Sequence, residues 1–93
     1  FQIAIELNPY DAQIRLQYTV YLHQVDRKDE AFEQAQIAYN HSPFNSEICY
    51  WMGVESYHQK DYKASIRYLE EALELNNKIE KAQKYLDFVK TKM

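Results

Sequence analysis

Apolar residues recur along this chain at the three- and four-residue steps that place them on one face of an α-helix. In the stretch 61–75, Ile66, Leu69 and Leu73 form one such stripe, and the polar pair Lys60–Asp61 precedes it. The pattern predicts helices at residues 1–7, 10–25, 28–41, 45–59, 62–75 and 78–92. Because the connections between these segments are short, we expect successive helices to run antiparallel, as helical hairpins.

The same pattern repeats every 34 residues. A shift of 34 positions superposes Ala4, Ala38 and Ala72 and places Pro9 on Pro43. A fixed period of this length is typical of arrays in which one supersecondary unit is stacked on the next. The 93 residues hold about 2.7 copies of the unit, so the chain begins and ends partway through a copy. The period therefore predicts an all-α chain of stacked hairpins.

Small residues and helix-capping residues fit this arrangement. Gly53, Ser65 and Ala72 fall where the two helices of one unit approach each other, and larger side chains would hold the helices apart. Asn8–Pro9 and Ser42–Pro43 each combine a capping residue with a proline, which is typical of the first turn of a helix. We therefore expect helices to start at these two pairs.

Three segments of one unit carry the motif of a known family. Trp51–Tyr57, Asp61–Ile66 and Glu71–Leu75, together with Ala38 and Pro43 of the unit before, resemble the tetratricopeptide repeat. The resemblance implies a right-handed superhelical solenoid of antiparallel helix hairpins, with about 2.5 repeats and a C-terminal capping helix. It divides a single domain, residues 1–93, into the end of a truncated repeat at 1–9, repeats at 12–45 and 46–79, and a capping helix at 80–93.

The two ends of the chain lead to separate expectations. Asp87 and Lys90 occupy positions that pack on a second helix in the preceding unit, so their polarity predicts a terminal helix that faces solvent. Phe1, Ala4 and Ile5 match residues that face a first helix, and the sequence does not contain that helix. We expect the chain to be the C-terminal part of a longer array, with an exposed apolar patch through which it can self-associate.

Composition and charge narrow the classes of function. Lys and Arg number 11 against 14 Asp and Glu, a net charge of −3, whereas binders of nucleic acid or anionic membranes are normally basic. The single glycine excludes the Gly-rich loops that hold nucleotide phosphates. No apolar run approaches the roughly 20 residues of a membrane span. No cofactor is expected, and the sequence does not fix the compartment, although it slightly favours the cytoplasm.

Candidate catalytic and metal-binding residues do not combine into a site. Cys49 and His58 are about 13.5 Å apart along one helix and point to different sides, so they cannot form a thiol–imidazole pair. Cys49 is expected in the core. His23 and His58 end equivalent helices and are expected within about 10–12 Å of each other, but they lack the further ligands of a zinc site. We therefore predict neither enzymatic activity nor a metal site.

In tetratricopeptide-repeat proteins the first helix of each repeat lines a concave groove that holds a peptide. Carried onto this sequence, the resemblance places Tyr50, Val54 and Tyr57 on one stripe at i, i+4 and i+7. The complete set of expected groove residues is Leu16, Gln17, Val20, His23, Tyr50, Trp51, Val54, Tyr57, His58, Lys81, Lys84 and Phe88. The alternative is that some of these aromatic residues pack between neighbouring helices instead.

The expected groove suggests a class of ligand. Aromatic and short aliphatic side chains suit the apolar side chains of a peptide, while Gln and His offer hydrogen bonds. The predicted function is a non-catalytic scaffold that binds a protein or peptide. Clamps for acidic C-termini carry Lys, Asn and Arg where this chain has apolar residues such as Leu16 and Val54, so such a clamp is not expected. Two alternatives stay open: a regulatory or substrate-docking segment of a larger enzyme, and an RNA-reading array, which the acidic balance disfavours.

Overall fold

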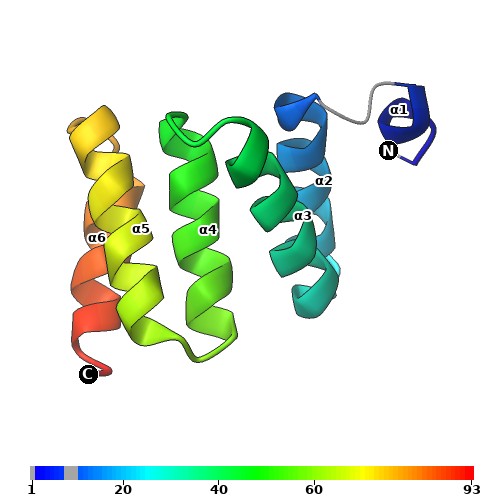
Figure 1. Ribbon diagram of the computed structural model, residues 1–93. Helices are drawn as coiled ribbons and strands as arrows, with labels where there is room; N and C mark the ends of the chain where they lie inside the picture. The colour runs from blue at the N-terminus through cyan, green and yellow to red at the C-terminus, as the bar shows by residue number, and fades with distance from the viewer. Residues whose placement is uncertain (1, 8–10) are drawn as a thin grey trace.

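The computed structural model of the chain describes residues 2–7 and 11–93, which form helices and no strand (Figure 1). The helices are α1 (Gln2–Leu7), α2 (Ala12–Gln24), α3 (Lys28–His41), α4 (Ser46–His58), α5 (Tyr62–Leu75) and α6 (Glu80–Lys90). The expected all-α fold is confirmed. Each expected helix also agrees with an observed one to within two residues at either end.

Consecutive helices pack as antiparallel hairpins. α2 packs against α3 and α4 against α5, while α6 lies against α5 at the end of the array. α4 also contacts α2 on one side and α6 on the other, so these three helices form one layer. α3 and α5 form a second layer, which lies nearer the viewer in Figure 1. The resulting molecule is elongated, with extents of 40 × 26 × 18 Å.

The period of 34 residues reappears in the backbone. Asp26 and Lys60 lie 34 positions apart and both have positive φ angles, 62° and 65°, which residues other than glycine rarely adopt. Asp11 and Asn45 occupy matching N-cap positions of α2 and α4, where their side chains accept hydrogen bonds from N–H groups of the first turn. Because turns and caps recur at the same spacing, the hairpins repeat the same local structure.

The expected helix start at Ser42–Pro43 is wrong. Ser42 instead ends α3, where its N–H donates a hydrogen bond to the carbonyl of Ala38, and Pro43 lies in the turn that follows. The cap of α4 is Asn45, whose side-chain oxygen accepts a 3.2 Å hydrogen bond from the N–H of Ile48. Asn45 directly precedes the first helical residue, which is the position from which a side chain reaches these N–H groups. The other expected pair, Asn8–Pro9, lies outside the described residues.

α4 and α5 approach closely where Gly53 faces Leu69. A Cβ atom at position 53 would lie 2.6 Å from Leu69 Cγ and 3.2 Å from the carbonyl oxygen of Ser65. The hydroxyl of Ser65 donates a 2.7 Å hydrogen bond to the carbonyl of Gly53, which ties the two helices together at this point. Ser65 and Ala72 are both buried. The expectation that small residues mark the crossing of the two helices is therefore confirmed.

The two ends of the described chain agree only partly with expectation. Asp87 and Lys90 are exposed on α6, and the role of this helix as a terminal cap stays a prediction. Ile5, however, is buried, with α1 packed against α2, so it does not belong to an exposed apolar patch. Ala4 is half-buried and Phe1 lies outside the described residues. Self-association through this patch stays a prediction that Ile5 does not support.

Replacing Gly53 by alanine should destabilise the protein although alanine is the better helix former. The helix propensity of alanine contributes about 1 kcal/mol in its favour, but overpacking against Leu69 and Ser65 costs about 1–3 kcal/mol. We expect the free energy of unfolding to fall by up to about 2 kcal/mol for Gly53→Ala, the difference between these two effects. Urea denaturation followed by far-ultraviolet circular dichroism measures this change.

A second substitution tests whether Leu69 is the cause. In a Leu69→Ala background the added methyl group has room, so Gly53→Ala should be neutral or stabilising there. If Gly53→Ala lowers the free energy of unfolding by the same amount in both backgrounds, the contact with Leu69 does not explain why residue 53 is a glycine.

Candidate functional site

A groove runs along the layer formed by α2, α4 and α6. It has a volume of about 440 Å³, and we call it the inner groove. Its lining residues are Gln13, Leu16, Gln17, Val20, Glu47, Trp51 and Lys81. α2 contributes four of these residues, α4 two and α6 one. The lining of this groove thus comes from the first helix of each expected repeat and from the last helix.

Apolar and polar residues are separated within the inner groove. Leu16, Val20 and Trp51 are buried or half-buried and provide an apolar floor, whereas Gln13 and Gln17 are exposed along its α2 side. The side chain of an amide residue both donates and accepts hydrogen bonds. The groove can therefore receive apolar side chains and bind polar groups at one edge.

An ion pair between α4 and α6 lies in the lining of the inner groove. Lys81 Nζ on α6 lies 2.9 Å from Glu47 Oε2 on α4 and 4.8 Å from the centre of the Tyr50 ring. Both charged side chains are about half exposed, at 48% and 44%. Pairs this exposed contribute little to stability, about 0–1 kcal/mol. Their main effect is that the groove carries balanced charge.

Five of the expected groove residues line the inner groove, and two others are buried beneath it. Leu16, Gln17, Val20, Trp51 and Lys81 are the five. Tyr50 and Val54, with exposed fractions of 9% and 2%, belong instead to the core between α4, α5 and α6. The expectation that Tyr50 and Val54 face a ligand is corrected, because α6 packs directly on that stripe of α4.

The remaining aromatic residues of the expected set join α4 to α6. The ring of Tyr57 lies 5.3 Å from that of Phe88 and 5.8 Å from that of Tyr85, measured between ring centres. Tyr57 is half-buried, while Phe88 and Lys84 are exposed on α6 without lining the groove. The alternative of packing between helices therefore describes Tyr57, whose ring packs against Tyr85.

His23 and His58 lie side by side at one end of the α2–α4 seam. Their ring centres are 5.2 Å apart, closer than expected, and the ring of Trp51 lies 5.2 Å from that of His23. Burial lowers the pKa of both histidines, and the charge of Lys28 acts in the same direction. Both imidazoles therefore favour their neutral form.

Glu55 is a buried carboxyl group that the sequence pattern does not reveal. Its side chain is fully buried, and its Oε2 atom lies 2.8 Å from Nδ1 of His23. Its Oε1 atom has no hydrogen-bond partner. Burial raises the pKa of Glu55 to about 7. The one signal in the sequence is that Glu55 stands in a repeat column otherwise occupied by Tyr21 and Val89.

The potential metal ligands of the described residues and the thiol of Cys49 lie apart from one another or in the core. In the described ranges 2–7 and 11–93, no group of three or more His, Cys, Asp or Glu residues is arranged to hold a metal ion. Cys49 is buried in the core as expected, and burial raises the pKa of its thiol to about 11. The same described part of the chain contains no helix with the length and hydropathy needed to cross a bilayer.

The buried pair predicts how stability depends on pH. The pKa of Glu55 is raised in the folded state. Its contribution to the free energy of unfolding is therefore fully present below about pH 4.5 and is lost as the pH rises through about 7. The lowered pKa values of His23 and His58 have the opposite effect on stability. The contribution of these two residues to the free energy of unfolding grows as the pH rises toward 6.5. Comparison with Glu55→Gln isolates the carboxyl group, because glutamine does not titrate in this range.

We expect the wild-type protein to lose about 1–3 kcal/mol relative to Glu55→Gln between about pH 5 and pH 8, since one pKa unit corresponds to about 1.4 kcal/mol. Urea denaturation of both proteins at several pH values measures the difference. A difference that stays constant across this range would contradict the raised pKa of Glu55.

The sequence and the fold of this chain are similar to those of known proteins. A family model described as tetratricopeptide repeat matches residues 46–79. A comparison with curated proteins gives no match. Two crystal structures of MamA are similar, one with a TM-score of 0.92 at 18% identity over 99% of this chain and 54% of that chain. The other has a TM-score of 0.88 at 19% identity, covering 96% of this chain and 49% of that chain.

The crystal structure of YrrB, described as a tetratricopeptide-repeat protein with an unusual peptide-binding site, is also similar. Its TM-score is 0.79 at 24% identity, over 90% of this chain and 43% of that chain. At these identities the likeness concerns the fold alone, and the chain spans about half the length of the solved structures it matches. Residues 46–79 therefore form a tetratricopeptide repeat, and the chain has the fold of the family to which that repeat belongs.

Proposed function

We propose that this chain is a non-catalytic protein-interaction module whose inner groove holds a peptide or a helix of a partner protein. The tetratricopeptide-repeat fold supports the general role of protein binding. The assignment of the ligand to the inner groove is our own and rests on the composition of that groove. YrrB, a protein of the same fold, is described as having a peptide-binding site, which supports a peptide as the ligand here.

The observation that carries this proposal is the apolar floor beside a row of exposed amides. Leu16, Val20 and Trp51 can bury apolar side chains of a ligand, and Trp is a residue that often dominates binding energy. Gln13 and Gln17 can exchange hydrogen bonds with the main chain or polar side chains of the same ligand. Together these groups suit an amphipathic segment more than a purely charged one.

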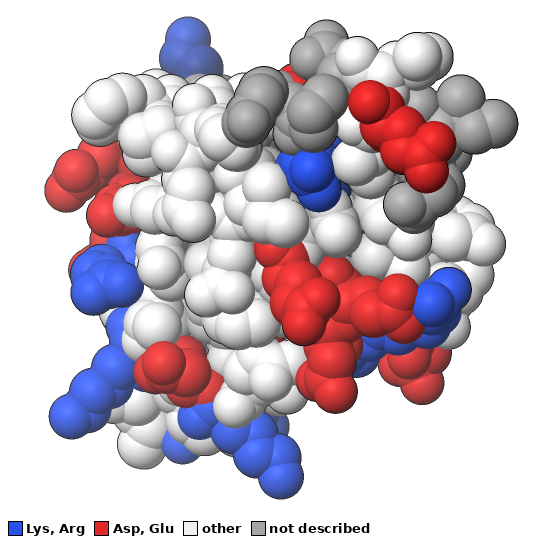
Figure 2. Space-filling view, turned by 45° about the vertical axis from the view of Figure 1, so that its right-hand side comes forward, with Lys and Arg blue, Asp and Glu red and all other residues white. Residues whose placement is uncertain are grey.

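The distribution of charge supports a polypeptide as the ligand in preference to a nucleic acid. Lys81 is the basic residue in the lining of the inner groove, and it is paired with Glu47. The lining therefore lacks the cluster of unpaired cations that binds a phosphate backbone. On the face that Figure 2 shows, the largest patch of Asp and Glu side chains lies right of centre, with smaller acidic groups elsewhere, and Lys and Arg are scattered mainly toward the rim. A net charge of −3 acts in the same direction.

The division into repeats, which we also propose, gives each unit one wall of the groove. Residues 12–45 supply α2, residues 46–79 supply α4, and the capping segment 80–93 supplies α6. The N-cap positions Asp11, Asn45 and Ile79 recur at 34-residue spacing directly before the three helices, which supports these boundaries. A ligand along the groove would therefore contact all three units.

Filling the inner groove with a large side chain should abolish partner binding while leaving the fold intact. Gln17 is exposed on the groove and Gln36 is exposed on α3 in the other layer, so Gln17→Trp and Gln36→Trp form a matched pair. We expect Gln17→Trp to reduce recovery of a specific partner at least tenfold and Gln36→Trp to leave it unchanged. Affinity capture with the full-length protein from its native cells, quantified by mass spectrometry, measures this.

Circular dichroism of both variants checks that each remains folded. Exposed positions are chosen because Tyr50 and Val54 belong to the core, where substitution would destabilise the chain itself. Equal recovery of every partner by the two variants would place binding outside the inner groove and would contradict the proposal.

A further inference from the structure

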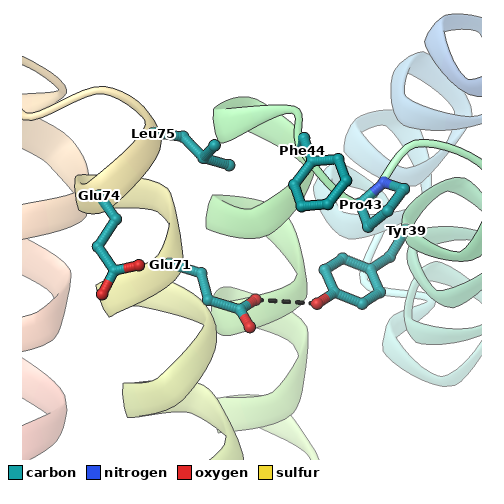
Figure 3. A pocket seen from close by; sticks show the side chains of 6 residues that line it. All are labelled: Tyr39, Pro43, Phe44, Glu71, Glu74 and Leu75. Carbon is teal, nitrogen blue, oxygen red and sulfur yellow. Dashed lines mark hydrogen bonds between the residues drawn. The ribbon is translucent and has the colours of Figure 1, made fainter.

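A second pocket lies on the opposite layer of the molecule, between α3, the α3–α4 turn and α5 (Figure 3). It has a volume of about 230 Å³, and we call it the outer pocket. Its lining residues are Tyr39, Pro43, Phe44, Glu71, Glu74 and Leu75. It shares no lining residue with the inner groove, which is formed by α2, α4 and α6.

A hydrogen bond fixes the carboxylate at the centre of the outer pocket. The hydroxyl of Tyr39 on α3 donates a 2.9 Å hydrogen bond to Glu71 Oε2 on α5, as the dashed line in Figure 3 shows. The ring of Tyr39 is itself held edge-on against Tyr68, with 5.1 Å between the ring centres. Burial and the bond to Glu71 raise the pKa of Tyr39 to about 12, so the hydroxyl stays a donor at neutral pH. Glu71 is thus an acceptor held in a fixed position in the lining of the outer pocket.

The apolar part of the outer pocket is exposed although its backbone is well anchored. Phe44 is 84% exposed and Leu75 is 43% exposed, and in Figure 3 the side chain of Leu75 points toward the α3–α4 turn, where the ring of Phe44 lies beside Pro43. The turn that carries Phe44 is held by the thiol of Cys49, whose Sγ lies 3.4 Å from the carbonyl oxygen of Pro43. Large apolar side chains that stay exposed on a fixed frame often mark an interaction site.

The charged residues that line the outer pocket are acidic, so the pocket favours a ligand with a positive charge. The ionisable lining residues other than Tyr39 are the two carboxylates Glu71 and Glu74, and in Figure 3 Glu74 lies on the far flank of α5. The nearby guanidinium of Arg67 lies over the ring of Tyr68, 5.0 Å from its centre, and does not line the pocket. The pocket therefore combines an apolar surface with an acidic wall.

We propose that the outer pocket binds a short segment of a partner protein in which an apolar side chain stands beside Lys or Arg. The apolar side chain packs between Phe44 and Leu75, and the cation reaches the carboxylate of Glu71. Charge-assisted hydrogen bonds of this kind are stronger than neutral ones. Because the outer pocket is separate from the inner groove, the chain can hold a ligand on each layer at the same time.

Synthetic peptides test the proposed chemistry directly. The probes are the acetylated tetrapeptide amides Gly-Leu-Lys-Gly, Gly-Leu-Glu-Gly and Gly-Ser-Lys-Gly, each titrated into the ¹⁵N-labelled full chain and followed by two-dimensional NMR. We expect Gly-Leu-Lys-Gly to cause saturable shifts around Tyr39 and Leu75. The other two peptides should bind at least fivefold more weakly, because one lacks the cation and the other the apolar side chain.

Two neighbouring glutamates provide a matched pair of variants. Glu71→Gln removes the charge of the pocket but leaves an oxygen that can still accept the hydrogen bond from Tyr39. Glu70→Gln removes a charge from the adjacent, exposed position on α5, outside the pocket. We expect Glu71→Gln to weaken the binding of Gly-Leu-Lys-Gly at least threefold. Glu70→Gln should change the affinity for the same peptide by less than about 1.5-fold.

Several outcomes would overturn the proposal. Equal binding of the lysine and glutamate peptides would show a purely apolar surface, and equal weakening by Glu70→Gln and Glu71→Gln would show only general attraction to an acidic protein. Shifts confined to the inner groove residues Gln17 and Trp51, or no saturable shift with any of the three peptides, would also refute it.

Discussion

The close crossing of α4 and α5 at Gly53 is the constraint on which the geometry of both surfaces depends. Leu69 occupies the space where a Cβ atom of residue 53 would lie, and Ser65 bonds to the carbonyl of Gly53 in the same place. With α5 held against one side of α4, the opposite side of α4 is left to meet α2 and α6 and so to form the inner groove. The outer pocket uses the other flank of the same α5 helix, beside α3. The absence of a side chain at Gly53 therefore helps to position both the inner groove and the outer pocket.

Much of the fold could be predicted from the sequence, because it depends on short-range patterns that repeat. Helix bounds follow from three- and four-residue spacing, and the 34-residue period determines which helices share a layer. The family resemblance places Leu16, Trp51 and Lys81 in one groove, and these three residues line the same pocket in the structure. Small residues at a crossing are equally visible in a sequence, since Gly53 has no other local reason to stand inside a helix.

What could not be predicted depends on distances between helices and on the environment of single side chains. Tyr50 and Val54 are buried because α6 packs on their stripe, and the spacing of residues does not give the depth of that packing. A glutamate such as Glu55 is normally expected on a surface, so its burial beside His23 emerges only from the structure. The outer pocket escaped prediction because it joins a turn of one unit to a helix of the next, and its shape depends on where Phe44 and Leu75 point.

The two seams of the inner layer differ in chemistry, and this difference bears on how the inner groove keeps its shape. α4 and α6 are joined by packed rings, among them Tyr57 and Tyr85, and burial raises the pKa of Tyr85, so this seam keeps its charge state at neutral pH. α2 and α4 are joined instead by the bond between His23 and Glu55, where burial raises the pKa of Glu55 to about 7 and lowers that of His23. Trp51 belongs to both seams, because its ring contacts His23 on one side and Tyr50 on the other. Since Trp51 also lies on the floor of the inner groove, its ring connects this groove to the His23–Glu55 pair.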